Sequence, residues 1–274
     1  MLADVTPSVN RVSFWRTFWT NAVIAPRTTL TWMRVDFVIG TTFIIPLMQI
    51  VFFAFVVQVG GGGASEIAFT ALGNAVATVT YSSVFAVCQT TDSEKQLGTM
   101  EHLLVTPANR LALHFGRGLV PILISLATVT VGIAYAVFLF GVHLAPSSVP
   151  SLAVSVTLTA FAMVGFGLLL GGVALYLRTS IILGNIFLFI GLLLSGVNFP
   201  VSQLPPVLQW IGYGFPLTWG LAAVRASVAG DPWGTVAVLW LAVVLAAAVS
   251  FALAIGLWKY FERRALATGS IARF

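Results

Sequence analysis

The chain has 274 residues, of which 59% are hydrophobic and only 8% are charged. A soluble domain carries roughly 25% charged residues, so this composition excludes an ordinary soluble protein and indicates an integral membrane protein. Since a helical span needs about 20 apolar residues, there is room for five to seven spans. The single cysteine, Cys88, excludes a disulfide framework.

The N-terminal region, residues 1–34, is expected to lie on the cytoplasmic face of the membrane. Residues 1–9 are polar and lack the apolar core of a signal peptide. Farther along, Trp15 and Trp19 lie on one helical face, with Arg11 and Arg16 nearby. This pattern is typical of an amphipathic helix that lies flat in the headgroup region; a plain membrane anchor is the alternative.

Apolar segments in residues 35–274 predict an all-α, polytopic membrane domain with six transmembrane helices. The predicted spans are residues 37–59, 67–90, 118–140, 151–177, 181–197 and 235–258. The glycine run at residues 60–63 must form a turn between the first two spans. Small residues in the fourth span, such as Gly165 and Gly172, allow close helix packing, which we expect to be mainly within the chain.

The longest charged interruption of the apolar pattern follows the second span, at residues 92–110. Leu97, Met100 and Leu104 recur there at helical spacing, and Pro107 ends the pattern. A short amphipathic helix held at the membrane surface by two spans is suited to receive a push from a soluble partner. An ordinary solvated loop is the alternative.

The segment at residues 198–232 is apolar and aromatic but is interrupted by prolines and glycines, so it cannot be one straight span. It predicts short helices that enter the outer leaflet from outside, before the last span. Its aromatic side chains are candidates for an outer gate and exit wall, although a belt of aromatic anchors explains them equally well. These residues are Phe199, Trp210, Tyr213, Phe215 and Trp219.

The basic residues predict the orientation of the chain. With six spans and both termini in the cytoplasm, 12 of the 13 Lys and Arg residues face the cytoplasm, as the positive-inside bias requires. This distribution explains the net charge of +5, and we expect no nucleic-acid partner. Only Arg225 lies outside, where an ordinary ion pair with Asp231 or Glu66 is the expected role.

Two ordered motifs resemble those of ABC-2 type permeases, the membrane subunits of type-2 ABC exporters. Residues 94–107 fit the pattern E-x-x-x-G-T-x-E-x-L-x-x-x-P, and residues 195–225 fit S-G-x-x-x-P…L-P…P-L-T…R. The resemblance implies that residues 92–109 form the coupling helix that docks on a separate ATPase subunit. The residues that it assigns to this contact are Glu94, Lys95, Gly98, Thr99, Glu101, Leu103 and Pro107.

The resemblance also implies an assembly of two permeases, identical or paralogous, with two ATPase subunits that bind ATP and Mg. A substrate path between the permeases is then expected along the first and fifth spans, although lipid-facing packing explains the same residues. The candidates for this path are Phe43, Met48, Phe52, Phe55 and Phe187.

Several kinds of chemistry are absent from the sequence. The predicted span cores hold no Asp, Glu, Lys, Arg or His, which argues against proton- or ion-driven transport. There is no Walker A motif and no metal-ligand spacing. We therefore expect a transport subunit in the bacterial inner membrane that is not itself an enzyme and holds no cofactor.

The lack of charges at the bilayer midplane favours an apolar or amphipathic cargo. The resemblance offers two classes, hydrophobic antibiotics of the daunorubicin type and lipid-linked polysaccharide. The composition, rich in Ala, Val and Gly and poor in Lys, is typical of a high-GC bacterium, in which antibiotic self-resistance is a common setting. Drug efflux is therefore the first prediction and polysaccharide export the alternative; a solitary secondary transporter or a non-transporting scaffold are further alternatives.

Overall fold

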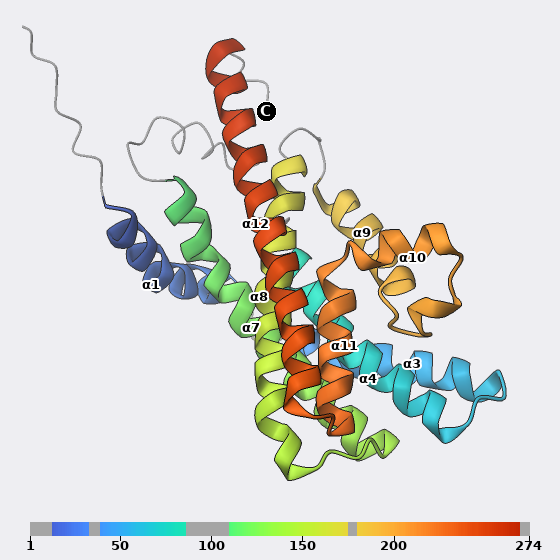
Figure 1. Cartoon of the computed structure of the whole chain (residues 1–274). Coiled ribbons are helices and arrows are strands. Elements are labelled where there is room, and N and C mark those ends of the chain that lie inside the picture. The colour runs from blue at the N-terminus through green and yellow to red at the C-terminus, as the bar shows by residue number, and fades with distance from the viewer. Residues whose placement is uncertain (1–12, 33–38, 86–109, 175–179, 269–274) are drawn as a thin grey trace, which may run out of the picture.

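The computed structural model describes residues 13–32, 39–85, 110–174 and 180–268, and all regular elements in these ranges are helical (Figure 1). The α-helices are α1 (Phe14–Trp32), α3 (Ile45–Val59), α4 (Ala64–Thr80), α7 (Arg110–Phe140), α8 (Val149–Ala174), α9 (Ser180–Leu194), α10 (Pro206–Tyr213), α11 (Pro216–Ala229) and α12 (Trp233–Thr268). The shorter helical turns are η1 (Gly40–Ile44) and η2 (Tyr81–Phe85), which are π-helical, and η3 (Pro146–Ser148) and η4 (Val201–Gln203), which are 3₁₀. The prediction of an all-α, polytopic fold is confirmed.

Within the described ranges, five helical segments are long and apolar enough to cross a membrane: Gly40–Val59, Ala64–Val84, Leu119–Phe140, Pro146–Val173 and Trp233–Tyr260. The predicted fifth span, residues 181–197, corresponds to α9, whose apolar part is the shorter stretch Ile182–Leu194. The 15 residues of α9 rise only about 22 Å, whereas the hydrocarbon core of a bilayer is about 30 Å thick. The sixth span therefore stays a prediction.

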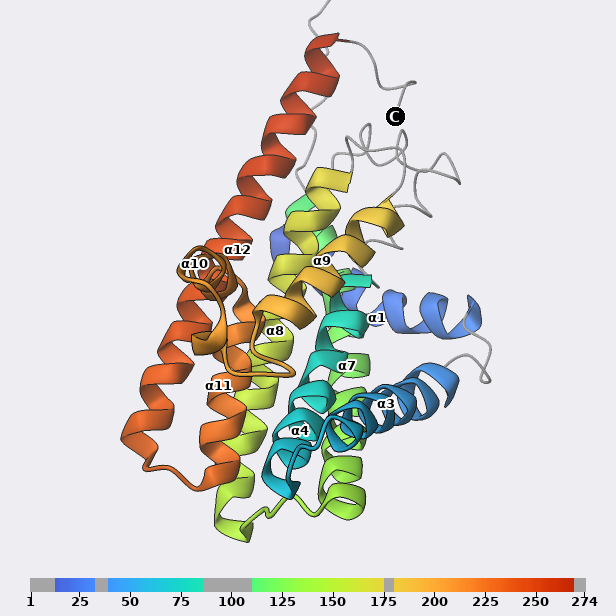
Figure 2. The ribbon, with the colours of Figure 1, turned by 90° about the vertical axis from the view of Figure 1, so that its right-hand side faces the viewer.

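The long helices α8 and α12 lie side by side and run in the same direction, with α11 packed against both of them (Figure 2). α4 and α7 pack against each other, and α3 packs on this pair. α1 packs against α7. The connections at residues 141–148 and 230–232 lie at the lower end of both views, and the C-terminal end of α12 lies at the opposite end.

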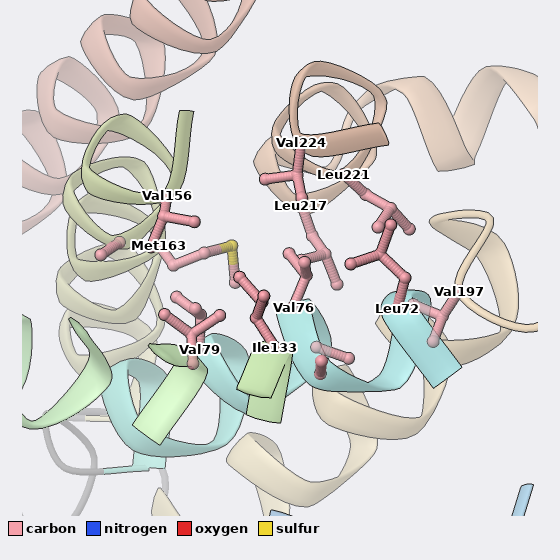
Figure 3. Packing of buried hydrophobic residues seen from close by; sticks show 14 of the residues in the cluster. Leu72, Val76, Val79, Ile133, Val156, Met163, Val197, Leu217, Leu221 and Val224 are labelled. Carbon is pink, nitrogen blue, oxygen red and sulfur yellow. The ribbon is translucent and has the colours of Figure 1, made fainter. Parts of the chain in front are cut away.

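α4 is the central helix of the core, and its residues 70–80 are all buried. Val76 and Val79 belong to one cluster with Ile133 of α7, Met163 of α8 and Leu217 of α11 (Figure 3). Because lipid tails are as apolar as these side chains, helices inside a membrane associate mainly through close packing. α4 is therefore held by shape complementarity on several sides.

Small residues bring α8, α11 and α12 close together. Ala162, Ala223 and Ala247 form a cluster between these helices. A methyl group at Gly220 of α11 would overlap the side chain of Thr159 on α8. Gly165 of α8 faces the ring of Phe251 on α12, so small residues of the fourth span serve packing within the chain, as expected.

The glycine run at residues 60–63 forms the turn between α3 and α4. Gly61 has a φ of +83°, a left-handed conformation that favours glycine. The N–H of Gly63 donates a hydrogen bond to the carboxylate of Glu66 at 3.1 Å, which caps the start of α4. These local contacts define the turn between α3 and α4.

The contact at Gly220 generates a stability prediction. Replacing Gly220 by Ala forces α8 and α11 apart, and we expect a loss of about 1–3 kcal/mol in the free energy of unfolding. Gly256→Ala on α12 is the matched control, because a methyl group there meets no atom within 4 Å. Thermal unfolding of the purified variants in detergent measures both. An unchanged Tm for Gly220→Ala would contradict the close packing of α8 and α11.

Candidate functional site

The predicted coupling residues lie outside the part of the chain that the structure describes. They are Glu94, Lys95, Gly98, Thr99, Glu101, Leu103 and Pro107. The described elements that flank this segment are η2, which continues α4 to Phe85, and α7, which begins at Arg110. The segment thus connects the central helix of the core directly to α7, and its role stays a prediction.

Four of the five candidate path residues lie on the exposed surface of the first span. Phe43, Met48, Phe52 and Phe55 are each between 46% and 61% exposed. Phe187 of α9 does not join them, because its ring is partly buried and packs against Phe166 of α8 with the ring centroids 5.9 Å apart. The four exposed side chains are available to lipid or to another protein chain, whereas Phe187 belongs to the interior.

The candidate gate residues do not form one wall. Phe215 is only 7% exposed and packs on Phe166 at 5.4 Å, inside the core. The indole N–H of Trp219 donates to the backbone carbonyl of Tyr213 at 2.9 Å, and their rings stack 5.5 Å apart. Trp210 is 80% exposed, and Phe199 is partly buried in the turn after α9.

Arg225 of α11 does not form the ion pair that we expected. Within the described ranges, its guanidinium donates to three backbone carbonyls, those of Gly196 at 2.7 Å, Val197 at 3.1 Å and Phe69 at 3.2 Å. The guanidinium also lies over the ring of Phe69, 3.4 Å from its centroid, a cation–π contact. Backbone dipoles and an aromatic face thus surround the charge, while its buried Nε has no hydrogen-bond partner among the described residues.

The surroundings explain why a cation is stable at this position. α9 ends at Leu194, and Gly196, with a φ of +79°, turns the chain. The C-terminal end of a helix carries unsatisfied carbonyls and a partial negative charge, which favours a nearby cation. On the other side, a methyl group at Gly73 of α4 would overlap the carbonyl oxygen of Val197, so glycine is needed for this approach.

A second polar contact holds the same turn, and the sequence analysis missed it. Asn74 of α4 is fully buried, and its amide donates to the side-chain oxygen of Asn198 at 2.8 Å and to the carbonyl of Thr70 at 2.9 Å. Gln49 of α3 donates to the side-chain oxygen of Asn74 at 3.1 Å. The hydroxyl of Thr70 reaches the carbonyl of Asn198 at 3.4 Å.

We call the five residues Gln49, Thr70, Asn74, Asn198 and Arg225 the turn cluster, because together they hold the turn at residues 195–198. The signal that could have found it is the pair of amide side chains at positions 49 and 74, inside otherwise apolar spans. A polar side chain at membrane depth needs a partner, so each of the two amides indicates a contact between helices.

The described spans contain few ionisable side chains. In the five candidate spans and in Ile182–Leu194, the only Asp, Glu, Lys, Arg or His residues are Glu66 and Lys259, each near an end of its span. No group of three or more His, Cys, Asp or Glu residues suited to a metal ion occurs in the described ranges.

The chain is similar to known proteins of one family. The family described as ABC-2 type transporter matches residues 21–229 of the chain. Nodulation protein J of Sinorhizobium fredii is 32% identical over 111 residues. That alignment covers 40% of this chain and 41% of Nodulation protein J, so it spans less than half of either protein.

The placement of the aromatic residues generates a second prediction. Phe215→Ala removes a buried ring, and we expect a loss of about 3–5 kcal/mol in the free energy of unfolding. Trp210→Ala removes an exposed ring, and a change within about 0.5 kcal/mol is expected. Equilibrium unfolding of both variants in detergent provides the comparison. Equal losses would show that the two rings share one environment, as a single gate wall requires.

Proposed function

Because the chain belongs to the ABC-2 type transporter family, we propose that it is the permease subunit of an ABC exporter that moves a hydrophobic or amphipathic compound out across the bacterial inner membrane. The family match over residues 21–229 is the observation that carries this proposal. Permeases of this family work with a separate ABC ATPase, and we propose that this subunit binds the ATP and Mg.

The charge distribution of the described spans supports an external energy source. Secondary transporters keep ionisable residues near the bilayer midplane to carry protons or ions, and here Glu66 and Lys259 lie near span ends. Among the residues that the structure describes, the fully buried polar side chains are neutral serines, threonines and one asparagine. These residues can pair helices but cannot take up and release a proton at physiological pH.

The connectivity supports a coupling role for residues 92–109. The chain passes from α4 through η2 into this segment and returns as α7, and α4 is the helix with the most buried surroundings in the core. A push delivered at this segment would therefore reach the centre of the permease first. We propose that Glu94 and Glu101 face basic side chains on the ATPase.

We further propose that two permease copies, identical or paralogous, assemble with two ATPase subunits. The apolar side chains of Phe43, Met48, Phe52 and Phe55 are exposed along the first span, which is compatible with a path shared between two copies or with lipid. We propose that both termini lie in the cytoplasm, with the turns at residues 60–63, 141–148 and 230–232 outside.

The coupling role is tested by charge reversal. Glu94→Lys and Glu101→Lys are expected to weaken binding of the ATPase encoded beside the gene at least about tenfold, since like charges across an interface cost several kcal/mol. Asp231→Lys is the control, because Asp231 is an exposed acid next to Gly230 at the far end of α11. Co-purification and ATP hydrolysis in nanodiscs are the measurements. Full binding and activity in both reversed variants would refute the assignment.

The cargo class is tested with the same complex. Stimulation of ATP hydrolysis by a daunorubicin-type compound, with no response to a lipid-linked oligosaccharide, is the expected result. The opposite response would replace drug export with saccharide export and leave the ABC mechanism in place. Cargo movement by the permease without any ATPase would instead establish a solitary transporter, and ATPase binding without cargo movement would indicate a scaffold.

A further inference from the structure

We propose that the turn cluster makes α4 and residues 195–229 move as one unit during transport, with Arg225 and Asn198 as the residues that position this unit. The inference rests on the proposed transport function, because it concerns how a movement of α4 reaches the segment after α9. It is carried by a set of contacts that join three separate stretches of the chain.

The contacts on α4 lie on one face of the helix. Phe69, Thr70, Gly73 and Asn74 have the spacing i, i+1, i+4 and i+5 and so lie on one face of the helix. All four contact the turn or Arg225. One face of α4 thus contacts the turn at residues 195–198 and the Arg225 side chain.

Two separate sets of contacts hold the turn. Arg225 binds its backbone through the carbonyls of Gly196 and Val197, whereas Asn74 binds the side chain of Asn198. Since Arg225 belongs to α11 and also donates to Phe69 of α4, the guanidinium fastens both ends of the segment to the same helix. α10 lies between these two fixed points.

The contact made by Arg225 is a strong one. Hydrogen bonds from a charged donor are stronger than neutral ones, and a surrounding of low dielectric strengthens them further. Arg225 has no carboxylate partner among the described residues, so its charge depends on the carbonyls and on the ring of Phe69. Separating residues 195–229 from α4 would break the hydrogen bond and ring contact of Arg225 with Phe69, and would also leave the amide of Asn74 without its partner on Asn198.

The C-terminal end of α4 is irregular. There the helix changes to the π-helical turn η2, where the Ser83 hydroxyl forms a hydrogen bond with Ser125 of α7 at 2.6 Å. π-helical turns inside longer helices often occur at functional sites. α4 therefore combines an irregular end, next to the predicted coupling segment, with an end that is fixed to residues 195–229.

The experiment measures distances with spin labels in the permease bound to its ATPase in nanodiscs. Labels are placed at Ser65→Cys and Ser202→Cys, both exposed positions, in a Cys88→Ser background, and a second pair uses Ser202→Cys with the exposed Ser147→Cys. We expect the 65–202 distance to stay constant between nucleotide-free and ATP-vanadate states, while the 147–202 distance changes. A 65–202 distance that changes as much as the 147–202 distance would overturn the inference.

Two variants then remove the contact. Arg225→Lys keeps the charge but loses the forked geometry, and Asn198→Ala removes the bond to Asn74 from a partly exposed position. We expect a broadened 65–202 distribution in both, and a fall of up to about tenfold in cargo moved per ATP hydrolysed, the size expected for one lost hydrogen bond. ATPase binding and hydrolysis should persist, which a general loss of folding would not allow.

The matched control is Gln209→Ala. Gln209 donates to the carbonyls of Leu204 at 2.7 Å and Ser202 at 3.3 Å, so the variant loses polar contacts within the segment but none to α4. It is expected to keep the wild-type distances and coupling. If Gln209→Ala and Arg225→Lys behave alike, or if Arg225→Lys and Asn198→Ala transport normally, the turn cluster has no positioning role.

Failure of the proposed function has a separate signature. If the wild-type permease binds no ATPase and moves no cargo, the transport proposal fails. The 65–202 distribution of the permease alone then still tests the contact, since a narrow wild-type distribution that broadens in both variants supports a fixed unit. A wild-type distribution as broad as that of the variants would overturn it.

Discussion

The close approach of the turn at residues 195–198 to α4 is the constraint on which the arrangement of this chain depends. Inside a bilayer, a backbone carbonyl without a hydrogen-bond donor costs several kcal/mol, so non-helical backbone persists only where protein covers it. Gly73 leaves room for the carbonyl of Val197, and Arg225 and Thr70 supply donors to the carbonyls of the turn. Asn74 binds the side chain of Asn198. Together they allow an irregular segment to pack against the most buried helix.

The short length of α9 makes this constraint necessary. The helix ends at Leu194, after a rise of about 22 Å, which is less than the thickness of the hydrocarbon core. The chain then turns at Gly196 and continues through η4, α10 and α11 before α12 crosses again. The attachment of this segment to α4 links it to the helix that precedes the predicted coupling segment.

The sequence predicted what depends on local composition and missed what depends on distant contacts. The long apolar spans and the turn at residues 60–63 were predictable, because hydropathy and glycine conformation act over a few residues. The predicted ion pair of Arg225 was wrong. Its guanidinium donates to the backbone carbonyl of Phe69, 156 residues away, and a backbone carbonyl has no side-chain signature in the sequence. Phe215 is a predicted gate residue that proves to be buried, because an irregular segment has no periodicity to reveal its buried side. The coupling motif remains a prediction.

The central claim is that a separate ATPase drives cargo through this permease, and transport into sealed inside-out vesicles tests it most directly. Vesicles that contain the permease and its ATPase should accumulate a daunorubicin-type compound when ATP is added outside. Vanadate should stop the accumulation, and a proton gradient without ATP should not support it. Accumulation driven by the gradient alone, or none of any offered cargo with ATP and an intact complex, would contradict the account.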